Sequence, residues 1–303
     1  MRKTRILASL GIAAVAAIAL TACNSGTPGD TGDGGDNGDG GTSTPWTVAT
    51  DVDLTGSPTF DRIQKAGKVA IGVKEDQPGL GYLDTTTGKR SGFDIDIARW
   101  MAASLGYGED KIDFKPIASA NREQAIVNGD VDFYVGTYSI TDKRKELISF
   151  AGPYFITGQG LLVAKDNDTI TGKDSLTADD VVCSATGSTS IQRIKDETPA
   201  KTKEYDTYST CVQDLLQGQV DAVTTDEAIL LGYAAQDPDN LKTVGDVFSE
   251  ERYGIGLTKG DTALQTFFND TLTDGNDIWQ QIFDNNLGAS GVKATQPEVD
   301  PVG

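Results

Sequence analysis

The chain has 303 residues, of which 45 are acidic and 26 are basic, so its formal net charge is −19 at pH 7. Such an acidic chain offers no cluster of Lys and Arg for a phosphate backbone, which excludes nucleic acid as a partner. It contains no His, which excludes nucleophile systems that depend on a His base. Without His or closely spaced Cys, we expect no metal site and no cofactor.

An export signal occupies residues 1–22. Basic residues at positions 2, 3 and 5 precede an apolar run that ends at Leu20, and small residues follow. The sequence LTAC at positions 20–23 looks like a bacterial lipobox, in which Cys23 becomes the lipidated first residue of the mature chain. A chance cysteine in an ordinary signal peptide is the alternative. No later apolar run approaches the length that crosses a bilayer, so we expect a soluble domain held by lipid at the outer face of the membrane.

Residues 23–50 are predicted to be a disordered tether. The stretch is dominated by Gly, Asp, Thr and Ser and cannot bury enough apolar surface to fold. The folded sequence begins near residue 60.

The first folded stretch alternates helices with strands. A helix at 60–66 closes at Gly67, and a buried strand follows at 68–73. Asp94 is a candidate N-cap for a helix that Gly106 ends, because the apolar residues between them keep to one face. Further elements are predicted as a strand at 112–114, a helix from 119 to 129 and a strand at 160–164.

Residues 129–154 hold the most informative local pattern. An alternating apolar segment at 131–135 predicts a buried strand that ends in a hydroxyl-rich turn. Thr141 suits the N-cap of the next helix, and Arg144 falls in its first turn. Free amides, hydroxyls and a guanidinium at the end of a strand can together form a binding site for a carboxylate. An ordinary corner with a solvated Arg is the alternative.

A second unit of the same kind follows. Strands are predicted at 181–184, 203–205, 220–224 and 241–244, with helices from 188, over 208–217 and over 226–235. A strand at 252–257 returns to the first unit, and one helix over 262–284 completes it. Strands that alternate with helices indicate an α/β fold with largely parallel pairing.

This length of folded chain predicts two lobes rather than one. We assign residues 60–164 and 253–288 to lobe 1 and residues 165–252 to lobe 2. The tail at 289–303 is rich in Gly, Pro and charge, so we expect it to be flexible.

Two cysteines remain if Cys23 carries lipid. In an oxidising compartment, an even pair such as Cys183 and Cys211 favours a disulfide. Two buried free thiols are the alternative.

Several motifs, in order and at matching spacing, resemble the polar amino-acid solute-binding proteins of bacterial ABC importers, family 3. The resemblance covers residues 60–285 and is carried by GFDIDIA at 92–98, NGDVD at 128–132, YSITDKR at 138–144, FAGPY at 150–154 and GQVDA at 218–222. It implies a type II periplasmic-binding-protein fold, in which two hinge strands join two mixed α/β lobes around one amino acid.

The resemblance also implies roles for individual residues. Arg144 would bind the ligand's α-carboxylate, and Thr137 and Ser139 would line its α-amino and α-carboxylate groups. From lobe 2, the turn formed by Gly187, Ser188 and Thr189 would cap the carboxylate at a helix N-terminus. Asp226 would pair with the ammonium group, because a buried zwitterion needs both of its charges met.

Two further cations suggest which amino acid is carried. Lys74 follows the first strand, and Arg122 opens a helix in a context that resembles glutamate- and aspartate-binding relatives. Two cations at one pocket suggest a second carboxylate on the ligand, hence glutamate or aspartate, with glutamine or asparagine weaker. Either cation is alternatively a solvated surface residue. Tyr208 offers a hydroxyl from lobe 2 or is a packing residue.

We therefore expect a monomeric binding protein that delivers its ligand to the transmembrane subunits of an ABC permease. An enzyme on the same fold, such as a cyclohexadienyl dehydratase, is one alternative, although no His or further catalytic domain supports it. A sensing module that signals to a membrane partner is the other.

Overall fold

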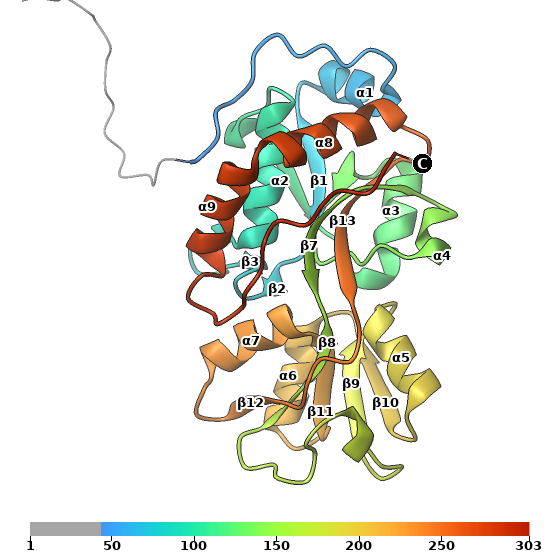
Figure 1. The fold of residues 1–303 in the computed structure, drawn as a ribbon, viewed down its shortest axis with the longest axis vertical. Helices are drawn as coiled ribbons and strands as arrows, with labels where there is room; N and C mark the ends of the chain where they lie inside the picture. Colours follow the sequence, from blue (N-terminus) through green and yellow to red (C-terminus); the bar gives the residue numbers. More distant parts are fainter. Residues whose placement is uncertain (1–43, 303) are drawn as a thin grey trace, which may run out of the picture. The chain divides into compact units, whose positions relative to one another are not determined.

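The computed structural model describes residues 44–302; the predicted signal peptide, Cys23 and most of the predicted tether lie outside the described residues. Two five-stranded sheets, each flanked by helices, form two lobes (Figure 1). The predicted two-lobed α/β fold is confirmed. Among the helices of residues 44–302, none is both long and apolar enough to cross a membrane.

Lobe 1 is built on the sheet β5-β1-β6-β13-β7, with a small separate sheet β2-β3-β4 beside it. Strands β5, β1 and β6 are parallel, whereas β13 runs antiparallel to both β6 and β7. Its strands are β1 (Val69–Val73), β2 (Asp76–Gln77), β3 (Gly81–Leu83), β4 (Arg90–Ser91), β5 (Ile112–Pro116), β6 (Phe133–Tyr134), β7 (Ser149–Thr157) and β13 (Glu251–Leu257). Its helices are α1 (Pro58–Ala66), α2 (Phe93–Ser104), α3 (Arg122–Asn128), α4 (Asp142–Lys145), α8 (Thr262–Asp274) and α9 (Asn276–Asn286).

Lobe 2 is built on the sheet β10-β9-β11-β8-β12. Strands β10, β9 and β11 are parallel, and β8 and β12 are antiparallel additions at one side. Its strands are β8 (Gln159–Ala164), β9 (Val181–Ala185), β10 (Lys201–Tyr205), β11 (Ala222–Asp226) and β12 (Leu241–Val244). Its helices are α5 (Thr189–Glu197), α6 (Tyr208–Leu216) and α7 (Glu227–Gln236).

The chain crosses between the lobes twice, at the junction of β7 with β8 and on entry to β13. The prediction placed residues 160–164 in lobe 1, but β8 pairs with β11 and β12 and belongs to lobe 2. Gly158 marks this crossing, because a Cβ there would lie 2.5 Å from the carbonyl oxygen of Ser249 on the other crossing segment. The two connections therefore pack directly against each other.

The C-terminal helix predicted at 262–284 is two helices in the structure. Helix α8 ends at Asp274 and α9 begins at Asn276. A Cβ on Gly275, between them, would lie 2.1 Å from the ring of Trp100 on α2. The break thus lets α2 approach, a tertiary contact that helical periodicity does not reveal. The same core holds Trp279, which is fully buried and stacks on Phe283.

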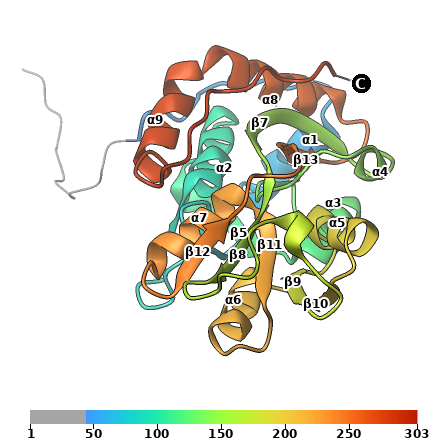
Figure 2. The same cartoon turned by 60° about the horizontal axis from the view of Figure 1, so that its bottom comes forward.

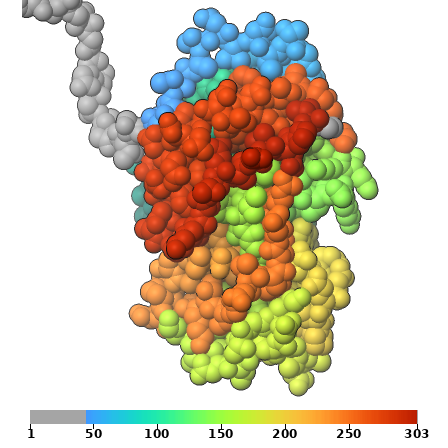
Figure 3. Space-filling model, in the orientation of Figure 1, coloured from blue at the N-terminus to red at the C-terminus, as the bar shows by residue number. Residues whose placement is uncertain are grey.

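Both ends of the described chain contact lobe 1, contrary to the flexible tail predicted at 289–303 and the tether predicted up to residue 50. The amide of Asp300 donates to the carbonyl oxygen of Gly152 at 2.7 Å, and its carboxylate pairs with Arg252. Figure 3 shows this C-terminal segment crossing the face of lobe 1 over β7 and β13. Near the other end, Trp46 packs against the core and the amide of Ala49 donates to Ala103. A few apolar contacts, hydrogen bonds and an ion pair thus hold both terminal segments against lobe 1, although their composition is polar.

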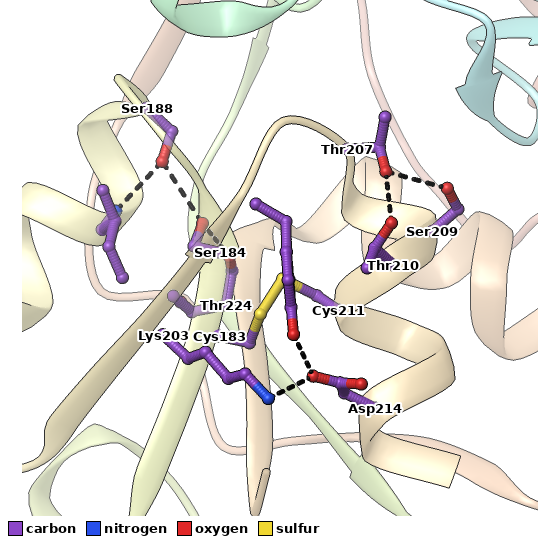
Figure 4. Close-up of a disulfide and its surroundings, with 12 residues drawn as sticks. Cys183, Ser184, Ser188, Lys203, Thr207, Ser209, Thr210, Cys211, Asp214 and Thr224 are labelled. Atoms are coloured by element: carbon purple, nitrogen blue, oxygen red, sulfur yellow. Dashed lines mark hydrogen bonds and ion pairs between the residues drawn. A yellow bond between two sulfur atoms is a disulfide. The ribbon is translucent and has the colours of Figure 1, made fainter. Parts of the chain in front are cut away.

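The predicted disulfide is confirmed. Cys183 on β9 and Cys211 on α6 are bonded, with Cα atoms 5.5 Å apart (Figure 4). Both side chains are fully buried. The bond therefore holds α6 against the sheet of lobe 2.

Replacing both cysteines with Ala should lower the free energy of unfolding by about 2–4 kcal/mol, because the bond restricts the unfolded chain across a separation of 28 residues. Denaturant unfolding followed by circular dichroism measures the change. Wild-type protein unfolded in the presence of a reductant is the control. Equal stability of the variant and the oxidised wild type would contradict this role.

Candidate functional site

The predicted site residues gather where the two lobes face each other. Lobe 1 contributes the ends of β1 and β6 and the helices α3 and α4. Lobe 2 contributes the N-terminus of α5 and the end of β11. Figure 2 shows α3 of lobe 1 beside α5 of lobe 2. A cleft of about 800 Å³ opens on this side, lined among others by Ser119, Glu123, Arg144, Gly187, Ser188 and Thr189.

Arg144 is held from three directions. Its helix α4 begins as predicted, because the Thr141 hydroxyl accepts the amide of Arg144 at 3.3 Å. The guanidinium Nε donates to Glu123 at 3.0 Å, while the two terminal nitrogens donate to the carbonyl oxygens of Ser139 at 2.7 Å and Gly187 at 3.2 Å. Since Gly187 belongs to lobe 2, Arg144 joins the lobes. The alternative of a solvated Arg is wrong, because only 7% of Arg144 is exposed.

The guanidinium groups of Arg144 and Arg122 both lie close to the ring of Tyr138. The ring centroid of Tyr138 lies 4.9 Å from the guanidinium carbon of Arg144 and 4.3 Å from that of Arg122. The face of an aromatic ring attracts such cations. Burial, with Arg122 nearby, lowers the pKa of Arg144. Residues 137–144 thus hold two cations beside one aromatic ring.

Lys74 and Arg122 are both buried, which rules out the alternative of solvated surface residues. The Lys74 ammonium donates to the Ser119 hydroxyl at 2.7 Å, and Arg122 donates to the carbonyl oxygens of Ser119 at 3.1 Å and Thr137 at 3.3 Å. Burial and the neighbouring Arg122 lower the pKa of Lys74 to about 7. An anion beside Lys74 would reverse this effect.

Thr137 has a left-handed backbone, with φ of +46°, which is unusual for a β-branched residue. The carboxylate of Asp94 accepts the Thr137 amide at 2.9 Å and the Tyr154 hydroxyl at 2.8 Å. Asp94 is therefore not the predicted N-cap: Gly92 occupies that position, and Asp94 lies inside α2. Gln77, which the sequence reasoning missed, donates its side-chain amide to the Thr137 hydroxyl at 3.1 Å. The partners are far apart in sequence, so local pattern gave no signal for either contact.

Ser188 and Thr189 occupy the start of α5 but contact different groups. Ser188 caps the helix, since its hydroxyl accepts the amide of Ile191 at 3.1 Å. The Thr189 hydroxyl instead donates to Glu251 at 3.1 Å, at the start of β13. Tyr208 is 4% exposed, and burial beside the Asp226 carboxylate raises its pKa to about 12.

Asp226 ends β11 with one carboxylate oxygen paired and one free. The Tyr253 hydroxyl, from lobe 1, donates to Oδ2 at 2.6 Å, whereas Oδ1 is buried without a partner within the described residues. Burial and the Glu251 carboxylate raise the pKa of Asp226 to about 7. The neighbouring Thr225 hydroxyl also lacks a partner there. Buried polar atoms are rarely left unpaired, so this corner is suited to a donor from a ligand.

Three buried cations, Lys74, Arg122 and Arg144, therefore lie on the lobe 1 side, and the buried carboxylate of Asp226 lies on the lobe 2 side, near that of Glu251. Such an arrangement can meet both charges of a zwitterion and at least one further anion. The open cleft does not include Lys74, Arg122 or Asp226, which are buried. Within residues 44–302, no group of three or more Cys, Asp or Glu side chains is arranged to hold a metal ion.

Comparison with known proteins gives the family. Residues 69–288 match the model of the bacterial extracellular solute-binding proteins, family 3. The glutamate-binding protein GluB of Corynebacterium efficiens is 42% identical over 73% of this chain and 79% of its own length. The glutamine-binding protein of Geobacillus stearothermophilus is 42% identical over 67% and 78%. An ancestral arginine-binding protein, solved with arginine, is 35% identical with a TM-score of 0.68, over 73% of this chain and 99% of its own.

This chain belongs to the bacterial extracellular solute-binding proteins, family 3. The family predicted from the motifs is confirmed, and with it a binding protein of the kind that serves ABC importers.

Replacing Asp94 with Ala should lower the free energy of unfolding by about 1–3 kcal/mol, because the buried Thr137 amide and Tyr154 hydroxyl lose their acceptor. Asp94→Asn keeps one acceptor oxygen and should lose less. Denaturant unfolding of both variants measures the difference. If Asp94→Ala is as stable as wild type, Asp94 does not hold the Thr137 backbone.

Proposed function

We propose that this protein captures L-glutamate or L-aspartate between its two lobes outside the cell and delivers it to the transmembrane subunits of an ABC permease. The observation that carries the proposal is that, of the three buried cations Lys74, Arg122 and Arg144, only Arg144 forms an ion pair with a carboxylate among the described residues. The names of the similar proteins support amino-acid binding rather than catalysis.

The backbone of the ligand accounts for part of this charge. Its α-carboxylate would bind Arg144 with the hydroxyl of Ser139 and the amides at the start of α5, and Thr137 would border its α-amino group. Its ammonium group would donate to the unpaired Oδ1 of Asp226. These contacts are common to all amino acids, so they do not select among them. Tyr208 lies near enough to Asp226 to border the same end of the ligand.

Lys74 and Arg122 then remain for the ligand side chain. Arg144 already pairs with Glu123, whereas the contacts of Lys74 and Arg122 are to neutral oxygens. A second carboxylate would neutralise charge that burial otherwise penalises, and an amide would leave it unmatched. Similarity does not choose between acid and amide, because the glutamate- and glutamine-binding relatives are equally identical to this chain. The two cations favour the acid.

The N-terminal proposals rest on the sequence alone. We propose that residues 1–22 are removed on export and that lipidated Cys23 holds a monomeric receptor at the outer face of the membrane. Mass spectrometry of the protein from the cell membrane tests this assignment.

Calorimetric titration with the twenty amino acids should show the tightest binding for glutamate or aspartate. Arg144→Ala should abolish binding of every amino acid, since each presents the same α-carboxylate. Lys74→Met, matched in length, should lower affinity for glutamate by about tenfold or more and affect glutamine less, because only the acid needs the cation.

A basic or apolar amino acid as the best ligand of wild type would refute the proposed specificity. Equal losses for glutamate and glutamine in Lys74→Met would show that Lys74 does not face the side chain.

The ratio of glutamate affinity to glutamine affinity should fall as the pH rises from 7 to 9. Without ligand, Lys74 loses its proton above its pKa of about 7. A bound carboxylate would raise that pKa, so glutamate binding takes up a proton in this range and weakens by up to about tenfold per pH unit. The ratio is used because titration of the ligand's amino group and of Asp226 affects the binding of both ligands, so these effects cancel.

Calorimetry in buffers of different ionisation enthalpy measures the proton uptake directly. Lys74→Met is the control and should give a ratio independent of pH. A pH-independent ratio in wild type would contradict a carboxylate at Lys74.

A further inference from the structure

Gly232 is the only glycine within a helix among the described residues. It lies in the middle of α7, where Ala would be favoured, because Gly loses more backbone freedom in a helix. A Cβ on Gly232 would lie 2.3 Å from the carbonyl oxygen of Pro78, which belongs to the other lobe. That contact requires glycine here, whereas the helix itself does not.

Residues 76–78, a loop made of the short strand β2 and the turn after it, also contact the start of α6. The Asp76 carboxylate accepts the amide of Ser209, in the first turn of α6, at 3.1 Å. Thr207, at the N-cap position, caps no amide with its side chain. Figure 4 shows its hydroxyl turned instead to the hydroxyls of Ser209 and Thr210. Lobe 1 therefore supplies the anionic cap that α6 lacks.

A third contact joins this loop to α7. The Tyr233 hydroxyl donates to the backbone carbonyl oxygen of Asp76, and 6% of Tyr233 is exposed. Tyr233 and Gly232 are adjacent in sequence, so α7 meets the loop through a hydrogen bond and through close backbone contact. Residues 76–78 thus dock against both helices.

We propose that residues 76–78 and their partners Ser209, Gly232 and Tyr233 form a latch that holds the two lobes closed and sets the affinity for every ligand by a common factor. The proposal rests on the proposed function, because it assumes that a ligand binds between the lobes. It adds residues that our assignment of ligand contacts does not include: none of these three contacts involves Lys74, Arg122, Arg144 or Asp226.

The affinity for every ligand changes by the same factor because binding is thermodynamically linked to closure of the lobes. A ligand that binds best to the closed form has an apparent affinity scaled by the fraction of protein that can close. Loss of the latch lowers that fraction equally for all ligands. Selectivity, which depends on contacts with the ligand itself, is unchanged.

Two variants of the full chain test the latch. Gly232→Ala should weaken binding of every amino acid that wild type binds by about tenfold or more, because its Cβ obstructs Pro78. Asp76→Ala should weaken all of them by about threefold to tenfold, through loss of one charge-assisted cap. In Gly232→Ala the ratios among ligands should equal those of wild type.

Glu75→Ala is the matched control, since Glu75 is the adjacent acid but pairs with Arg90 within lobe 1. It should bind as wild type does. Thermal unfolding without ligand should show that Gly232→Ala is at least as stable as wild type, which separates obstruction of closure from misfolding. Small-angle scattering with saturating ligand should show less compaction in Gly232→Ala.

Wild-type affinity and compaction in Gly232→Ala would overturn the latch, as would loss of affinity for one ligand alone in that variant. These outcomes are separate from the proposed function. If wild type binds an amino acid other than glutamate or aspartate best, the proposed ligand is wrong, and the same variants are measured with the amino acid that binds.

Discussion

Charge buried between the lobes is the constraint on which the rest of the structure depends. Lys74, Arg122 and Arg144 lie at 5%, 2% and 7% exposure on one side, and the carboxylate of Asp226 lies at 4% on the other. Removal of such groups from water is costly unless each finds a partner. The protein supplies Glu123 for Arg144 and the Tyr253 hydroxyl for one oxygen of Asp226, whereas Lys74 and Arg122 have no carboxylate partner among the described residues.

In our proposal, binding of the ligand closes the two lobes. Because the cations belong to lobe 1 and Asp226 to lobe 2, a zwitterion that satisfies both must draw the lobes together. The two connections between the lobes pack closely against each other at Gly158 and Ser249. The Cys183–Cys211 disulfide stabilises lobe 2, and an aromatic core stabilises lobe 1.

Affinity and selectivity are divided between different residues in our proposals. The ligand side chain is distinguished at Lys74 and Arg122, whereas the contacts of residues 76–78 with α6 and α7 act on closure. Substitution at one set can change which amino acid is carried, and substitution at the other can change how tightly any of them is held. Gly232 shows this division most clearly. A glycine destabilises helix α7, and only the close approach of Pro78 from lobe 1 requires one at this position.

The sequence alone determined the family, the two-lobed fold, the disulfide pair and the helix starts at Thr141 and Ser188. These features depend on motifs or on capping contacts within three residues, which a linear pattern records. Only the tertiary structure decided the position of β8, the break at Gly275, the role of Asp94 and the docking of both chain ends on lobe 1. Each depends on a partner far away in the chain, so no local propensity encodes it. Burial of Lys74 and Arg122 was decided in the same way, since the same residues on an open surface would have been solvated.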